Sequence, residues 1–232
     1  MDPDRLAGIL RGIEDDRRRG DAVGDLLCAT CVEVLDVTGA GIMLMAGGRH
    51  QGTLGVSDSV SSVVEELQFT TGEGPCVDAS TTISPVFEPD LERPAHNRWP
   101  AFAGPAVTAG AAAVFGFPLL AGTASVGALD LYLSRPGHLD AGQVDDAVVL
   151  AEVITAIVLS LQAAASPGTL AAQLGSGVDR RAVVHQAAGM ASVQLGVDVG
   201  AALARIRAHA YTSDRPVDEV ARDIVERRLR LE

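Results

Sequence analysis

Several residue types are scarce in this chain of 232 residues. It contains no lysine, so all 18 basic residues are arginine, and aromatic residues make up only 3%. A core with so few aromatic rings must rely on Ala, Val, Leu and Ile. Three cysteines, Cys28, Cys31 and Cys76, do not form a disulfide framework.

The chain also lacks a segment typical of secretion or membrane insertion. It begins MDPDRLAGIL, which carries acidic residues and no apolar signal core. The most apolar run, residues 147–161, is interrupted by Glu152 and is shorter than the roughly 18 to 20 residues that a membrane span needs. We therefore expect a soluble, cytoplasmic protein with no membrane partner.

Motifs of the common enzyme classes are missing as well. There is no G-x-S-x-G, no P-loop and no H-E-x-x-H. His50, His138, His185 and His209 are scattered, and their spacing predicts no metal site. We expect no enzyme and no metal, and the sequence identifies no cofactor.

Charge is unevenly distributed along the chain. Residues 179–232 hold nine arginines and eight acidic residues, a net charge of +1, whereas the remainder holds nine arginines and 22 acidic residues, a net charge of −13. The hydrophobic content of 47% excludes a disordered protein. These numbers predict an acidic folded domain joined to a near-neutral, arginine-rich one.

The first 163 residues alternate helices with strands, which is typical of an α/β domain with a mainly antiparallel sheet. A short helix is predicted over residues 2–19, a second begins near residue 21, and the segment around Cys76 is predicted as a loop. Further elements are predicted in chain order: strands over 40–45 and 51–56, a helix from Ser57 or Asp58 to about 67, a helix ending near 109, strands over 113–120 and 125–133, and a helix over 142–165.

The C-terminal part has the pattern of a three-helix module. Helices are predicted from about Asp179 to Leu195, from Asp198 to Tyr211 and from Pro216 to Leu231, with Asp198 as an N-cap and Pro216 at a first helical position. One apolar face is predicted on each of the last two helices, and Arg228 is predicted to share that of the third.

Two resemblances follow from these motifs. Residues 21–163 resemble a GAF domain through Gly72-Glu73-Gly74-Pro75-Cys76, Asp90-Leu91, Arg98-Trp99-Pro100-Ala101-Phe102, Phe117-Pro118-Leu119 and Gly127-Ala128-Leu129. Residues 179–232 resemble the ANTAR domain, a bacterial RNA-binding module of transcription antiterminators. Residues 1–20 are predicted as a helical extension and 164–178 as a linker that contains Ser166-Pro167-Gly168.

The resemblances imply a signal-responsive regulator whose ANTAR domain binds RNA stem-loops in nascent transcripts. The guanidinium group of arginine can donate two hydrogen bonds to one phosphate, and the ring of tyrosine or histidine can stack on an unpaired base. The residues expected to contact RNA are Arg181, Gln186, Arg205, Arg207, His209, Tyr211 and Arg215. The chain departs from the ANTAR pattern at Ala188, where a basic residue is usual, and at Ala191-Ser192, where a Leu-Met pair is usual.

The GAF resemblance also implies a hollow between the sheet and a capping loop. The residues expected to line it are Met43, Cys76, Trp99, Phe115 and Phe117. The low aromatic content argues against stacking of a flat ring, so we expect a small apolar ligand or none.

An alternative role is a thiol enzyme or redox sensor. Cys76 would then react with an oxidant or a small sulfoxide, and Cys28 or Cys31 would resolve the sulfenate. The opposing interpretation is that Cys76 fills a tight turn beside Pro75 and that the other two cysteines are core residues.

A homodimer is the expected assembly. Apolar residues surround most of the circumference of the predicted helix over 144–161, which is more than one sheet face covers. We expect this helix to pack on a second copy, in a bundle with the helix that contains Leu26, Leu27 and Val34.

Overall fold

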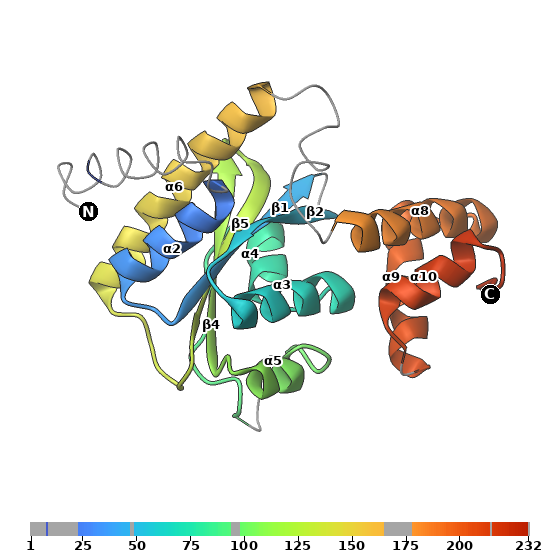
Figure 1. The fold of residues 1–232 in the computed structure, drawn as a ribbon, viewed down its shortest axis with the longest axis horizontal. Helices are drawn as coiled ribbons and strands as arrows, with labels where there is room; N and C mark the ends of the chain where they lie inside the picture. The colour runs from blue at the N-terminus through green and yellow to red at the C-terminus, as the bar shows by residue number, and fades with distance from the viewer. Residues whose placement is uncertain are drawn as a thin grey trace.

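A computed structural model describes residue 8 and residues 23–46, 49–93, 98–164, 178–213 and 215–231. The predicted helix over 2–19 and the linker residues 165–177 lie outside these ranges. Two bodies are present (Figure 1): a sheet domain over residues 23–164 and a three-helix domain over residues 178–231.

The sheet domain contains five strands and five helices among the described residues. Its strands are β1 (Gly39–Ala46), β2 (Arg49–Val56), β3 (Val86–Glu88), β4 (Ala113–Ala121) and β5 (Ala124–Leu133). Its helices are α2 (Val23–Leu35), α3 (Ser59–Thr71), α4 (Pro75–Thr82), α5 (Ala103–Ala109) and α6 (Ala141–Ala164). The strand order is β2-β1-β5-β4-β3, and every pairing is antiparallel.

Helices cover both faces of this sheet. α2 and α6 lie on one face, and α3, α4 and α5 lie on the other (Figure 1). The α2/α6 layer buries alternate strand residues such as Ile42, Leu44 and Leu129. Met43, Val114 and Ala128, on the other side of the same sheet, are buried beneath α3, α4 and α5. The α/β class with a mainly antiparallel sheet is therefore confirmed.

Local sequence signals set the limits of α3. The side chain of Asp58 accepts a hydrogen bond from Ser61 N at 2.8 Å, which satisfies a free donor of the first turn. The helix ends at Gly72, whose φ of 70° suits glycine. It is one turn longer than predicted, and this extra turn carries Phe69.

Two elements were not predicted. Residues 75–82 form helix α4 rather than a loop, because Pro75 occupies a first helical position, where its missing N–H costs nothing. The three-residue strand β3 was also missed. Cys76 therefore lies in the first turn of a helix.

The three-helix domain consists of α8 (Val178–Leu195), α9 (Val199–Thr212) and α10 (Val217–Val225). Asp198 caps α9 by accepting from Gly200 N at 2.8 Å and from Ala201 N at 3.0 Å, as predicted. The buried apolar faces of the last two helices are also as expected: Ala202, Leu203, Ile206, Ala210, Val217, Val220, Ala221 and Ile224.

The third helix is shorter than predicted. The chain leaves the helix after Val225, and Arg227 has a φ of 60°. Leu231 returns to the core, where its carbonyl accepts a hydrogen bond from Gln194 Nε2 at 2.8 Å. The prediction that Arg228 shares the apolar face is wrong, because its guanidinium pairs with Asp223 at 2.6 Å on the surface.

Candidate functional sites

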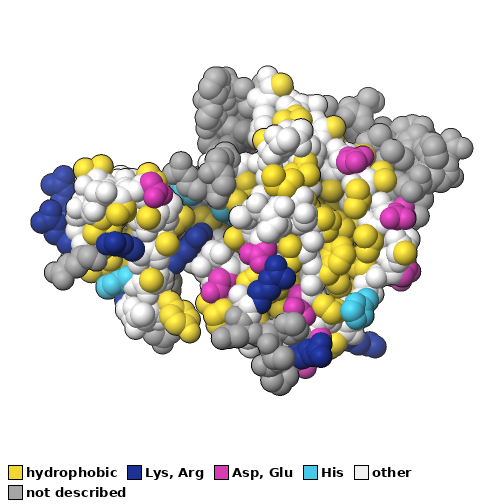
Figure 2. Space-filling view, turned by 180° about the vertical axis from the view of Figure 1, so that it is seen from behind, with side chains coloured by type: hydrophobic (Ala, Val, Ile, Leu, Met, Phe, Trp, Pro, Cys, Tyr) yellow, Lys and Arg dark blue, Asp and Glu magenta, His cyan; other side chains and the backbone are white. Residues whose placement is uncertain are grey.

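The polar residues expected to contact RNA do not share one environment. Arg205 is exposed on α9, Gln186 is exposed on α8, and Tyr211 is 71% exposed near the end of α9. His209 is half-buried. The side chain of Arg181 lies outside the described part of the structure. Figure 2 shows basic side chains on both domains, whereas the acidic side chains on this face lie mostly on the sheet domain.

Arg207 turns towards the sheet domain instead of solvent. Its Nη2 donates a hydrogen bond to the carbonyl oxygen of Phe69 at the end of α3. Its Cζ lies 6.0 Å from the centroid of the Phe69 ring. Burial lowers the pKa of this guanidinium to about 10, so it remains charged at neutral pH.

Arg215 is surrounded by carboxylates of its own domain. Its Nη2 lies 2.7 Å from Asp223 Oδ2, and its Nε lies 3.8 Å from Glu219. Hydrogen bonds from Arg215 and Arg228 lower the pKa of Asp223. The charge of Arg215 is thus largely compensated, which leaves less of it for a phosphate than an unpaired arginine would offer.

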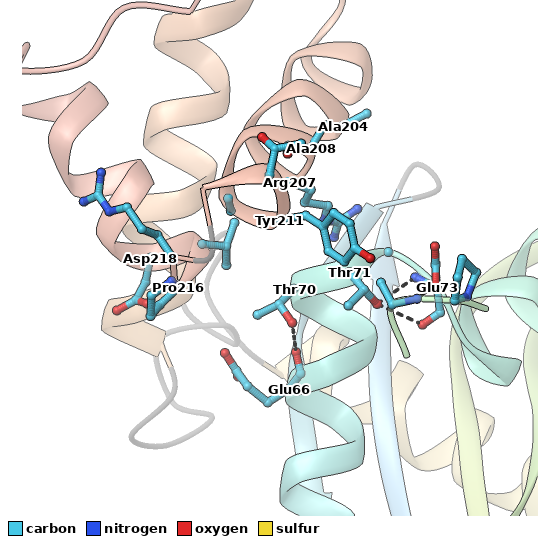
Figure 3. Close-up of a pocket in the computed structure, with 17 residues that line it drawn as sticks. Glu66, Thr70, Thr71, Glu73, Ala204, Arg207, Ala208, Tyr211, Pro216 and Asp218 are labelled. Atoms are coloured by element: carbon cyan, nitrogen blue, oxygen red, sulfur yellow. Dashed lines mark hydrogen bonds between the residues drawn. The ribbon is translucent and has the colours of Figure 1, made fainter. Parts of the chain in front are cut away.

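A cleft of about 1380 Å³ separates the two domains. The end of α3 forms one wall and α9 with the start of α10 forms the other (Figure 3). The side chain of Tyr211 extends from α9 towards Thr71 in this view. Three of the residues expected to contact RNA, Arg207, Tyr211 and Arg215, line this cleft.

The five residues expected to line a ligand cavity are divided by the sheet. Met43 and Cys76 are fully buried on the α3/α4/α5 side, and Trp99 is buried in the apolar cluster of that side. Phe115 and Phe117 point to the opposite side, where they belong to the α2/α6 core. These five side chains therefore do not surround one space.

Trp99 anchors the segment before α5 onto α4. Its Nε1 donates to Asp78 Oδ2 at 3.1 Å, and Arg98 lies over the ring at 4.8 Å while pairing with the same carboxylate at 2.9 Å. The ring also meets Phe102 edge-on at 6.0 Å. These contacts give Trp99 a packing role.

A buried polar network lies between the sheet and α3, and the sequence did not reveal it. Gln68 Nε2 donates to Asp130 Oδ2, and Gln68 Oε1 accepts from Cys76 N at 2.9 Å. Asp130 sits in β5 between Gly41 of β1 and Gly116 of β4, whose missing side chains make room for the network. One signal was available: Asp130 interrupts an otherwise apolar strand.

Two carboxyl groups of this region are almost fully buried. Glu65 is 1% exposed and Asp130 is 3% exposed. Glu65 Oε1 and Asp130 Oδ1 have no hydrogen-bond partner among the described residues. Burial, followed by the charge of Glu65, raises the pKa of Asp130 well above its usual range.

The three thiols are inaccessible and divided between the two faces. Cys28 and Cys31 face the α2/α6 core, whereas Cys76 lies on the other side of the sheet. The sheet therefore lies between Cys76 and the other two cysteines, whereas a disulfide needs Cα atoms within roughly 7 Å. Burial raises the pKa of Cys31 to about 12 and those of Cys28 and Cys76 well above the ordinary value. The geometry gives no support to a thiol enzyme.

Two further properties concern the described residues alone. No group of three or more His, Cys, Asp or Glu side chains there is placed to hold a metal ion. No single helix there is long and apolar enough to cross a membrane, although α8 and α9 meet that criterion together as a pair bent by 106°.

Comparisons with known proteins match both domains. Residues 21–158 match the family model of the GAF domain, and residues 172–225 match that of the ANTAR domain. No curated protein matches the chain by sequence.

Several solved structures, two of them GAF domains, resemble the sheet domain. The GAF domain of a phosphoenolpyruvate-protein phosphotransferase from Acinetobacter superposes with a TM-score of 0.52 at 14% identity, covering 72% of this chain and 99% of that one. A corresponding domain from Coxiella burnetii gives 0.49 at 17% identity, covering 68% and 95%. A type II free methionine-R-sulfoxide reductase from Thermoplasma acidophilum gives 0.45 at 12% identity, covering 58% and 91%.

Identities this low concern the fold alone, and the activity of the reductase is not carried over to this chain. The GAF model spans more than half of the residues, and the ANTAR model covers the three-helix domain almost completely. The combination of a GAF domain with an ANTAR domain supports a regulator in general. The chain therefore belongs to the GAF domain family and carries an ANTAR domain after its GAF domain.

Proposed function

We propose that this protein is a signal-responsive, RNA-binding regulator of transcription antitermination. The observation that carries the proposal is the ANTAR match over residues 172–225, on a bundle whose helix α9 presents Arg205 and Tyr211 to solvent. Arginine supplies a charged fork for phosphate, and tyrosine supplies a ring for an unpaired base. RNA stem-loops in nascent transcripts offer both groups.

The GAF domain is the sensing part of this proposal. A ligand on the α3/α4/α5 side of the sheet would meet Met43, Cys76 and Trp99, and it would not reach Phe115 or Phe117. Asp130 and Glu65 add buried polar atoms to the same side. A small ligand with an apolar body and one polar group matches this combination.

Homodimerisation through α6 completes the proposal. Val148 is 41% exposed and Leu159 is 39% exposed on this helix, although both are apolar. Burying them against a second copy removes apolar surface from water. A dimer would hold two ANTAR domains, and binding of paired hairpins would then gain from effective concentration. A monomeric mass in light scattering at micromolar concentration would contradict this part.

RNA binding is tested with the full chain and leader RNA that carries two hairpins, over a series of salt concentrations. Arg205→Ala should weaken binding and reduce the slope of log affinity against log salt by about one. Arg135→Ala is the matched control, because Arg135 is exposed on the GAF domain. Equal affinity of the wild type for duplex DNA and scrambled RNA would refute the proposal.

A further inference from the structure

We propose that the GAF domain and RNA compete for the same side of α9, so that the docked arrangement is a closed state that binds RNA weakly. The inference rests on the RNA-binding function proposed above. The contact that covers this side of α9 is formed by Phe69 and Gly72 of the GAF domain and Arg207 of the ANTAR domain. The GAF domain thus controls RNA access directly, through a surface that it covers.

The first observation is the position of the Phe69 ring. Phe69 belongs to a GAF helix, yet it is 2% exposed as part of the apolar cluster of the ANTAR domain. Its ring meets His185 of α8 at a centroid distance of 6.0 Å and a tilt of 65°. On the GAF side, the ring of His50 lies 5.1 Å away. The phenyl ring is therefore enclosed from both domains, and separating them would expose it to water.

The second observation is that Arg207 is already engaged in contacts with the GAF domain. Its guanidinium donates to the Phe69 carbonyl near the C-terminal end of α3. It lies directly over Gly72, where any Cβ would collide with Nη1 of Arg207. A cation at the C-terminal end of a helix is also favoured by the helix dipole. An arginine held in this way is withdrawn from phosphate.

The third observation is the charge of the opposite wall of the cleft. Glu66 and Glu73 of the GAF domain line the cleft opposite α9 and the start of α10. Glu73 is fixed there, because its Oε2 accepts a hydrogen bond from Ala101 N at 2.8 Å. A phosphate approaching Arg207 or Tyr211 would meet these carboxylates. Arg205 and Gln186 do not line this cleft, so the closed state retains only part of the RNA surface.

Two variants of the full chain should open the contact in different ways. Phe69→Ala removes the shared ring. Gly72→Asn keeps the left-handed end of α3, which asparagine tolerates, and places a side chain where Arg207 lies. Phe87→Ala is the matched control, because Phe87 is 43% exposed on strand β3 and meets Phe115 and Phe117 of its own domain.

Two quantities are measured for each protein: the Kd for paired-hairpin RNA and the radius of gyration from small-angle scattering. Both opening variants should show a larger radius and bind RNA about tenfold more tightly, because the competent fraction of molecules rises. The control should match the wild type in both.

The outcomes separate the two proposals. A larger radius with unchanged or weaker RNA affinity would refute the claim that the GAF domain covers the RNA-binding side of α9. The proposal that the protein binds RNA would still stand. An unchanged radius in both variants overturns the role of this contact. If neither the wild type nor the opened variants bind hairpin RNA, the proposed function itself fails, and the inference falls with it.

Discussion

Replacing Gly116 with alanine should disrupt the packing of α4 against the sheet. Gly116 lies in β4 opposite Asp130, on the face that α4 covers. A Cβ at this position would lie 2.6 Å from the carbonyl oxygen of Pro75 and 2.9 Å from the amide nitrogen of Cys76. Both are backbone atoms, so no side-chain rotation relieves the collision, and the first turn of α4 must move.

The size of the effect follows from what this movement breaks. Overpacking a core of this kind costs typically about 1–3 kcal/mol. Moving Cys76 N away from Gln68 Oε1 also leaves a buried donor without its partner, which costs about 1–3 kcal/mol. Alanine recovers about 0.4–1 kcal/mol through the lower entropy of the unfolded chain. We expect a net loss of about 3 kcal/mol in the free energy of unfolding.

Urea denaturation followed by circular dichroism measures this loss. With a slope of about 1–3 kcal/mol per molar urea, the midpoint should fall by about 1 M or more. Gly52→Ala is the control, because a Cβ at Gly52 meets nothing within 4 Å in strand β2. If the two variants unfold at the same midpoint, α4 does not depend on the close approach at Gly116, and the reasoning is refuted.

Three further predictions concern the GAF domain. Because the pKa of Asp130 is raised in the folded state, the folded protein holds this proton more tightly than the unfolded chain, and stability declines as pH rises above about 3.9. Asp130→Asn should flatten the dependence of the urea midpoint on pH from 4 upwards, and an unchanged slope would contradict the raised pKa. Asp58→Ala should lower the free energy of unfolding by about 1–2 kcal/mol, because the cap on Ser61 N and the 3.2 Å hydrogen bond from Tyr132 are both lost. Asp58→Asn should retain most of this stability in the same urea denaturation. All three cysteines are buried, so an aromatic disulfide reagent should modify none in the native protein and all three in urea; rapid native labelling of one thiol would show that its cover opens.

The helices and long strands were predictable from the sequence because their signals are local. Alternating and helical periodicities placed α2, β4, β5 and α6, and Asp198 marked the start of α9. Helix α4 was missed because its Gly-Glu-Gly-Pro start is also typical of a loop. The length of α10 was overestimated, since the turn at Arg227 carries no glycine.

The sites were harder to predict because they depend on contacts between distant residues. Phe115 and Phe117 were expected beside Met43, but both faces of the sheet are buried, so an apolar residue gives no indication of the face it joins. The hydrogen bond from Arg207 to Phe69 joins residues 138 positions apart. Periodicity within a helix identifies a polar face, and only the folded chain shows what covers it.

The burial of Phe69 in the apolar cluster of the ANTAR domain also limits how freely these domains can be recombined. A bundle of about fifty residues buries a modest fraction of its surface and has a small margin of stability. Its apolar cluster is completed by an aromatic ring that another domain supplies. Transplanting the ANTAR domain onto an unrelated sensor would therefore leave a gap beside His185, unless the new sensor brings an aromatic side chain to the same place. An engineered fusion should therefore transfer the two domains together.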